Sequence, residues 1–187
     1  MPVDGEVTGE FKCSNCVDRK FHFDASVSRY RARGVVRDLI HRFKYGREYY
    51  LRHQLAEWAT AGLEDDRLRN PDFDALVPVP LHSARRRERE FNQAEAIAEL
   101  LAERCGKRVV KALQRIRHTD SQTRHDRAER MENLRGAFRV RQPDAVLNRR
   151  LVLVDDVFTT GSTVEECARV LTEAGAASVR ALVVARR

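Results

Sequence analysis

The sequence LVLVDDVFTTGST, residues 151–163, restricts the fold of this chain more than any other stretch. Four apolar residues lead into two adjacent carboxylates, Asp155 and Asp156, and a short loop rich in hydroxyl groups follows. A short apolar run that ends at turn residues is typical of a buried strand. The stretch therefore predicts a strand over Arg150–Val154 that leads through a polar loop into a helix.

The residues that follow predict a helix over Thr163–Ala174, ended by Gly175, and then a strand over Val179–Ala185. The expected apolar face of the helix consists of Val164, Cys167, Ala168 and Leu171. A strand, a helix and a second strand in succession form a βαβ unit, which implies a parallel sheet. We therefore predict an α/β fold with a mostly parallel central sheet flanked by helices, and a ligand at the carboxyl ends of the strands.

The loop before the predicted helix has the chemistry of a phosphate site. Backbone N–H groups and the helix dipole favour an anion at a helix N-terminus, and Gly161 allows close approach to the backbone. Hydroxyl donors surround this glycine: Thr159, Thr160, Ser162 and Thr163. The Walker A lysine and the GxGxxG pattern are both absent from this stretch, which argues against nucleotide hydrolysis and dinucleotide binding.

Asp155 and Asp156 indicate what lies beside the phosphate. Two carboxylates repel phosphate oxygens, but they suit ribose hydroxyls or a bound divalent cation. Neighbouring residues of a strand point to opposite faces, although both side chains reach one ligand if the backbone turns after the strand end. The alternative is that the pair caps the helix or solvates the end of the strand.

A second strand is predicted over Ala75–Val79, in the sequence ALVPVP. Its two prolines lack N–H donors, so the strand ends near Val77 or Val79. We expect a basic loop next, containing His82 and the run Arg85–Arg89. A helix then starts at Asn92 and ends at Gly106.

Apolar spacing predicts two earlier helices, one over Val36–Phe43 and one that begins near Leu51 and fades at Gly62. Further along, Val109–Leu113 is predicted as one strand. The segment Arg115–Arg135 has few apolar residues, which predicts a mobile loop with a short helix over Arg127–Leu134.

The chain has 187 residues, which predicts one domain over 29–187 with a short appendage over 1–28. No apolar run is long enough to span a membrane, and the N-terminus does not resemble a signal peptide, so we expect a cytoplasmic protein without membrane insertion. The net charge of +7 indicates an anionic partner, either nucleic acid or a phosphorylated small molecule. Monomer and oligomer both remain open.

Cys13 and Cys16 form a CxxC pair in the predicted appendage. A structural zinc site normally needs four ligands, often from two such pairs. His22 offers a third ligand, and no fourth is evident in the sequence. Two interpretations stay open, a Zn²⁺ site and the remnant of a shortened zinc ribbon.

The stretch 151–163 resembles the signature by which type I phosphoribosyltransferases bind 5-phosphoribosyl-1-pyrophosphate (PRPP). The resemblance narrows to the ComF family, which is named for a role in bacterial DNA uptake. It is carried by YRARGVVRDLIHRFKYG (30–46), VPVPLHSARRREREFNQ (77–93) and the residues Arg117, Thr119, Gln122, Arg130, Asn133 and Phe138. Nearly the whole chain from Tyr30 onward is similar to this family.

The resemblance assigns roles by position. Asp155 and Asp156 would hold the ribose hydroxyls and act in catalysis. The 5′-phosphate would be bound by Val157, Phe158, Thr159, Thr160, Gly161, Ser162 and Thr163. Pyrophosphate with Mg²⁺ would lie on a loop made of Val79, Pro80, Leu81 and His82, with Arg85 and Arg89 beside it. Lys44 would approach the pyrophosphate or the acceptor, and the segment from Arg115 would resemble a flexible hood; solvated surface charge is the alternative for these cations.

Two positions depart from the family pattern. Members commonly begin with a four-cysteine zinc module, and this chain has only the pair Cys13 and Cys16. Glu90 stands where the family usually carries glycine, in an RGFNQ-like segment. A glycine there suits a special backbone angle or close approach of a ligand.

Two functions follow from the resemblance. The first is Mg²⁺-dependent transfer of phosphoribose from PRPP to an unknown acceptor, with release of pyrophosphate. The second is a non-catalytic, PRPP-sensing or competence-type accessory protein that handles single-stranded DNA or binds competence proteins. Aromatic residues make up 7% of the chain and are not interleaved with its basic runs, which argues against a stacking groove for single strands.

Overall fold

The structure is a computed structural model that describes residues 20–70, 72–117 and 127–187. A parallel sheet lies at its centre, in the strand order β1-β8-β7-β3-β4, and β2 also pairs with β8. The strands of this sheet are β1 (Ser26–Val27), β2 (Tyr30–Arg31), β3 (Ala75–Pro78), β4 (Arg108–Val109), β7 (Arg150–Phe158) and β8 (Ser178–Arg186). The predicted α/β class with a mostly parallel sheet is therefore confirmed.

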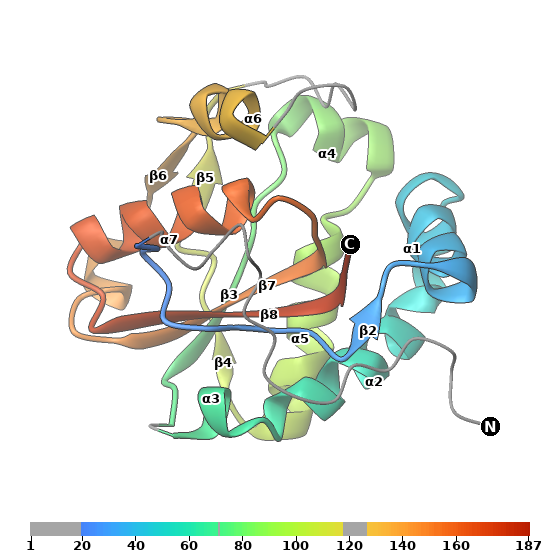
Figure 1. The fold of residues 1–187 in the computed structure, drawn as a ribbon, viewed down its shortest axis with the longest axis horizontal. Coiled ribbons are helices and arrows are strands. Elements are labelled where there is room, and N and C mark those ends of the chain that lie inside the picture. The colour runs from blue at the N-terminus through green and yellow to red at the C-terminus, as the bar shows by residue number, and fades with distance from the viewer. Residues whose placement is uncertain (1–19, 71, 118–126) are drawn as a thin grey trace.

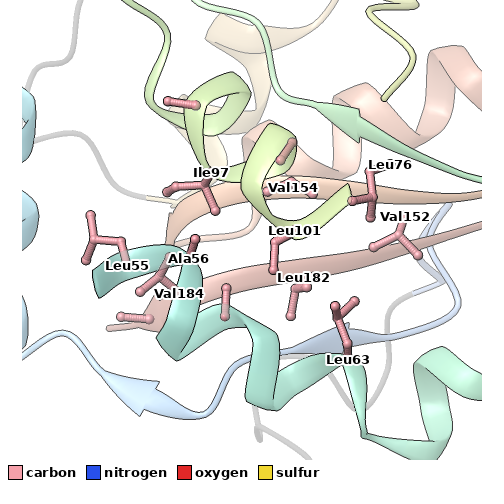
Figure 2. Close-up of a cluster of buried hydrophobic side chains, with 14 of the residues drawn as sticks. Leu55, Ala56, Leu63, Leu76, Ile97, Leu101, Val152, Val154, Leu182 and Val184 are labelled. Carbon is pink, nitrogen blue, oxygen red and sulfur yellow. The ribbon is translucent and has the colours of Figure 1, made fainter. Parts of the chain in front are cut away.

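Helices cover both faces of the sheet (Figure 1). The helices are α1 (Gly34–Tyr45), α2 (Arg52–Leu63), α3 (Asp66–Arg69), α4 (Ser83–Arg89), α5 (Gln93–Cys105), α6 (Arg127–Leu134) and α7 (Ser162–Glu173), with 3-10 turns η1 (Tyr49–Leu51) and η2 (Pro143–Ala145). On one face, α2 and α5 pack against alternate residues of β3, β7 and β8, as Figure 2 shows for Leu101, Val152 and Leu182. On the other face, α7 buries Cys167, Ala168 and Leu171 against Leu151 and Leu153.

The alternation along β7 explains why both faces are covered. Val152 and Val154 belong to the core under α2 and α5, whereas Leu151 and Leu153 belong to the core under α7. A strand with apolar residues on both faces must be sandwiched between two layers. Helix α5 has the predicted ends, because Asn92 caps its start and Gly106 follows it in a left-handed conformation.

The order of the strands defines where a ligand site can form. The chain leaves β3 through α5 to reach β4 on one side, and it leaves β7 through α7 to reach β8 on the other side. Between β3 and β7 the direction of the connections reverses, and ligands of open α/β sheets bind at the carboxyl end of such a point. The segments that follow β3 and β7 therefore lie on either side of the position where a ligand is expected.

Three boundaries differ from the sequence predictions. The strand expected over Arg150–Val154 continues to Phe158, because Val157 and Phe158 pair with Ala185 and Arg186 of β8. The basic loop expected over Arg85–Arg89 is instead helix α4. Arginine, glutamate and alanine are good helix formers, but α4 has no buried residue, so apolar periodicity gives no signal for it. The short helix α3, between α2 and β3, has no counterpart among the predicted elements.

The apolar run Val109–Leu113 was predicted as one strand, and this is wrong. β4 ends at Val109, and β5 (Leu113–Arg115) pairs antiparallel with β6 (Phe138–Val140) in a second sheet. Every residue of this segment except the exposed Lys111 is apolar, because Val109 packs on the core beneath α5, while Val110, Ala112 and Leu113 pack on the core beneath α7. Apolar residues on both sides of Lys111 therefore hide the point where the chain changes sheets.

The first described residues, 20–31, run along the sheet rather than away from it. Ser26 and Val27 pair with Ala181 and Leu182 of β8, although they fall within the range 1–28 predicted as an appendage. Cys13 and Cys16 lie outside the described residues. Over the described ranges, no helix combines the length and the apolar character that a membrane crossing requires.

Candidate functional site

The end of β7, the turn after it and the start of α7, here together called the β7 loop (Val157–Thr163), change the direction of the chain sharply at the carboxyl end of the sheet. Gly161 adopts a left-handed conformation with φ of 79° and precedes the first residue of α7. A Cβ at this position would lie 2.5 Å from Cζ of Phe158, so the turn requires glycine for space as well as for its angle. The close packing of Gly161 on Phe158 sets the direction in which α7 begins.

Helix α7 begins without a side-chain cap. The hydroxyl groups of Thr160 and Ser162 instead bond to each other, with their oxygens 2.9 Å apart, and Ser162 is buried. The first N–H groups of a helix carry a partial positive charge and lack partners within the helix. The β7 loop thus has the donors and the dipole of an anion site, as its sequence predicts.

Asp155 and Asp156 lie on β7 itself and point to opposite faces. Asp156 is buried and its Oδ1 is 2.7 Å from Nζ of Lys44, at the end of α1. Asp155 lies on the face of α7 and β5, where Cys167 and Arg115 interact with it electrostatically. The expectation that the strand ends before the two aspartates is therefore wrong, and the carboxylates differ in their surroundings.

Burial and the neighbouring carboxylate of Asp156 raise the pKa of Asp155 to about 7. Lys44, the backbone N–H of Asp156 and Arg115 oppose this rise. The N–H of Asp156 donates to Oδ1 of Asp155 over 2.9 Å. A carboxyl group that titrates near neutral pH is typical of a functional site, because purely structural carboxylates are usually fully ionised there.

The segment after β3, here called the β3 turn (Val79–His82), is held from two sides. The N–H of Val79 donates to the carbonyl of Val154 on β7 over 3.0 Å, and Nδ2 of Asn92 donates to the carbonyl of Val79 over 3.0 Å. His82 then caps α4 by accepting from the N–H of Ala84. These bonds fix the β3 turn beside the end of β7, where the reversal of the connections places a ligand.

Helix α4 brings two of the predicted cations to this edge of the sheet. Arg89 donates to Oε1 of Gln93 over 3.0 Å and to the hydroxyl of Tyr45 over 3.1 Å, and its guanidinium lies 4.8 Å from the centre of the Tyr45 ring. Arg85 is close enough to Arg115 to lower the pKa of that guanidinium. Arg89 thus joins α4 to α1, and Arg85 faces β5.

Glu90, the departure from the family pattern, ends α4 in a left-handed conformation with φ of 68°. The expectation of a special backbone angle at this position is confirmed. The glutamate side chain is exposed and forms an ion pair with Arg47 over 3.3 Å. The chain therefore keeps the turn that a glycine would favour and accepts the conformational cost of a larger residue.

Arg115 lies beside the candidate site, whereas the sequence predicts only that it begins a segment resembling a flexible hood. It lies on β5 with its guanidinium largely buried, 5.5 Å from the centre of the Phe138 ring, and burial lowers its pKa. A signal for it exists in the sequence, because Leu113 and Arg115 are two residues apart and so share one face of a strand. Leu113 is buried, which places Arg115 on the inner face as well.

Of the residues predicted as zinc ligands, the structure describes only His22. His22 bonds to Glu165 of α7 twice, through Nδ1 at 2.7 Å and through its backbone N–H at 3.0 Å. Within the residues that the structure describes, no three His, Cys, Asp or Glu side chains gather as metal ligands would. Cys13 and Cys16 fall outside those residues, so the zinc interpretations stay as predicted.

Comparison with known proteins gives three kinds of match. The phosphoribosyl transferase domain family matches residues 91–187. The chain is 29% identical over 180 residues to Competence protein F of Haemophilus influenzae, which covers 93% of this chain and 78% of that protein. It is 41% identical over 108 residues to the DNA utilization protein YhgH of Salmonella typhi, which covers 57% of this chain and 47% of that protein.

Among solved structures, the chain is similar to the glutamine PRPP amidotransferase from B. subtilis. The TM-score is 0.46 and the identity is 23%, over 70% of this chain and 25% of that chain. This chain therefore spans about half the length of the YhgH relative and a quarter of the amidotransferase.

Proposed function

Because this chain belongs to the phosphoribosyl transferase domain family, we propose that it binds PRPP and transfers phosphoribose to an acceptor with release of pyrophosphate. The resemblance to the ComF family is confirmed by the match to Competence protein F. The observation that carries the proposal is the pairing of Val79 with Val154, which holds the β3 turn and the acid-bearing end of β7 side by side.

The β7 loop would bind the 5′-phosphate of PRPP. Gly161 allows the phosphate to approach the uncapped start of α7, where N–H groups and the helix dipole favour an anion. Thr159 is exposed and Thr160 is partly buried, so both hydroxyls can add bonds to phosphate oxygens. Asp155 and Asp156 would accept hydrogen bonds from the ribose hydroxyls next to the phosphate.

The β3 turn would receive the pyrophosphate. Arg85 and Arg89 stand on α4 directly after this turn, and Arg115 approaches from β5. This excess of positive charge suits a highly charged pyrophosphate that arrives as a magnesium complex. When bound, Mg²⁺ would neutralise part of the charge that builds up on the leaving pyrophosphate.

The chain itself needs to supply little covalent chemistry for this reaction. Transfer of phosphoribose passes through a sugar with cationic character, so the protein acts by positioning the donor and stabilising charge. Asp155 and Asp156 lie where their negative charge would stabilise such a sugar. The arginines would hold the departing pyrophosphate, which fixes the direction in which the bond breaks.

Calorimetric titration with PRPP, with and without Mg²⁺, tests donor binding. We expect wild-type protein to bind and the double substitution Asp155→Asn, Asp156→Asn to abolish the heat. The matched control is Asp38→Asn with Asp144→Asn, two exposed carboxylates whose removal changes the net charge equally. Absence of binding to the folded wild type would refute the proposal. A screen of acceptors for PRPP-dependent pyrophosphate release then tests turnover.

The names of the relatives favour a second candidate, a non-catalytic protein that handles single-stranded DNA. The run Arg85–Arg87 on α4 would then contact phosphates, and binding would weaken steeply with salt. Under this alternative, Arg85→Ala, Arg86→Ala and Arg87→Ala together abolish DNA binding, whereas Asp155→Asn with Asp156→Asn leaves it intact. PRPP binding without any salt-dependent DNA binding would eliminate this candidate.

A further inference from the structure

The ion pair between Lys44 and Asp156 joins two parts of the chain that are far apart in sequence. Nζ of Lys44 lies 2.7 Å from Oδ1 of Asp156, and the two side chains are only 20% and 8% exposed. Lys44 belongs to the last turn of α1, whereas Asp156 belongs to β7. Burying a charged pair costs desolvation, and this makes a buried pair weak evidence for a purely stabilising role.

We propose that Lys44 is a positioning residue of the donor site, which holds Asp156 in place and favours the ionised form of Asp155 for the ribose hydroxyls. This inference rests on the proposed function. The sequence resemblance placed Lys44 near the pyrophosphate or the acceptor, but the ion pair directs its charge at Asp156 instead. Lys44 would thus act on the ligand through the carboxylates.

Asp155 has a carboxylate neighbour and cations on both faces of β7. Asp156 is the next residue along the strand and pairs with Lys44 on the opposite face, whereas Arg115 on β5 and the thiol of Cys167 on α7, which is neutral because burial raises its pKa, lie on the face of Asp155. Burial and Asp156 raise the pKa of Asp155 to about 7, against the opposing effects of Lys44 and Arg115. Lys44 lowers the pKa of Asp155, so without its charge the pKa of Asp155 would rise further.

The protonation state of the carboxylates decides whether the site can accept hydrogen bonds from the ribose hydroxyls. Two ionised carboxylates offer only acceptors, which match the hydroxyl donors of the sugar. A proton on the pair replaces one acceptor by a donor and removes negative charge from the position where the sugar becomes cationic. Lys44 would therefore set the pH above which the donor binds well.

Carboxyl ¹³C NMR titration of the ligand-free protein tests the inference directly. In Lys44→Met we expect the midpoint of Asp155 to rise by about one pH unit or more. Lys44→Arg keeps the charge and should stay close to the wild type. The control Lys107→Met removes a lysine that pairs with Asp72, outside the donor site, and should leave the midpoint unchanged.

PRPP affinity measured between about pH 6 and pH 9 gives the second readout. Since one pKa unit corresponds to a tenfold change in equilibrium and the wild type is itself half protonated near pH 7, Lys44→Met should bind about fivefold more weakly at pH 7, close to tenfold more weakly at about pH 6, and recover at high pH. An equal loss at every pH would overturn the inference and indicate a direct contact or a structural role. Lys44→Gln, which keeps the chain length without the charge, replaces Lys44→Met if that variant does not fold.

The two readouts separate the two proposals. If wild-type protein does not bind PRPP, the proposed function fails, but the NMR titration still reports whether Lys44 controls the carboxylates. If PRPP binds and the midpoint of Asp155 is the same in Lys44→Met and wild type, the role of Lys44 is refuted and the proposed function stands.

Discussion

The β7 loop and the β3 turn lie at the same edge of the sheet, but they are built in different ways. The β7 loop is shaped by its own neighbours in sequence, since Gly161 packs on Phe158 and Thr160 bonds to Ser162. The β3 turn is shaped by partners elsewhere in the chain. Val154 and Asn92 hold its Val79, and the helix after it is tied to α1 through Arg89 and Tyr45.

This difference suggests that one segment contributes backbone groups to a ligand site and that the other contributes side chains. The β7 loop offers N–H groups whose positions follow from one left-handed glycine and the start of a helix, so it can grip a phosphate with few charges. The β3 turn leads into α4, whose cations have positions that depend on packing between α1, α4 and α5. We therefore expect substitutions in the β7 loop to act locally, and substitutions around the β3 turn to act through other elements.

Gly161→Ala should have the largest effect on stability. A left-handed angle costs alanine about 1 kcal/mol, and the new Cβ would press into the Phe158 ring, so we expect a total loss of about 3 kcal/mol. Urea unfolding measures this loss. Gly106→Ala is the matched control, because Gly106 has φ of 65° but no atom lies within 4 Å of its new Cβ. Equal losses in both variants would show that Phe158 does not support the β7 loop.

Asn92→Ala should destabilise the protein by about 2 kcal/mol, since it removes the cap of α5 and leaves the buried carbonyl of Val79 without its donor. Asn92→Asp keeps the capping oxygen but not the donor, so it should lose about half as much when unfolding is followed by urea. The β3 turn would prove independent of α5 if the aspartate variant matched the wild type and still bound PRPP equally well.

Asp155→Asn should stabilise the ligand-free protein at neutral pH while it weakens PRPP binding. The pKa of Asp155 is raised in the folded state to about 7, so the folded state binds the extra proton between about pH 4 and pH 7. The free energy of unfolding of the wild type should therefore fall as pH rises through this window and then level off. At about pH 8 we expect the asparagine variant to be roughly 1–2 kcal/mol more stable.

Thermal unfolding of both proteins at several pH values measures this difference. The variant should lack the part of the fall that Asp155 causes, whereas other carboxylates contribute equally to both proteins. Parallel pH profiles for variant and wild type would contradict the raised pKa of Asp155. A more stable variant that also binds PRPP as tightly would contradict the role of this carboxylate.

Glu90→Gly should have the smallest effect, and it should stabilise the protein. Glycine relieves the left-handed strain of about 1 kcal/mol, and loss of the exposed ion pair with Arg47 offsets part of the gain, so we expect a net stabilisation of about 0.5 kcal/mol. Glu88→Gly, in the exposed interior of α4, should instead cost about 1 kcal/mol. Equal signs for the two substitutions in urea unfolding would show that the angle at Glu90 carries no strain.

Elements that are marked by a pattern within one short stretch of sequence were predictable, and the structure shows why. The βαβ unit from β7 to β8 follows from an apolar run, a hydroxyl-rich loop and a helical apolar face, all within about 35 residues. Helix α4 was missed because it buries nothing, and the break between β4 and β5 was missed because apolar residues on either side of Lys111 pack on two different cores. An amphipathic pattern shows which face of a helix or strand is buried. It gives no signal where neither face is buried or where both faces are buried.

For the candidate site, the sequence by itself determined the chemistry of the β7 loop, because a glycine turn, hydroxyls and a helix start are adjacent along the chain. Only the tertiary structure decided which groups share the site with it. Lys44 meets Asp156 across 112 residues, and Arg115 reaches Asp155 from the second sheet. These contacts depend on the order of the strands and the packing of the helices. Both arise from burial of the whole core, so no single stretch of sequence predicts them.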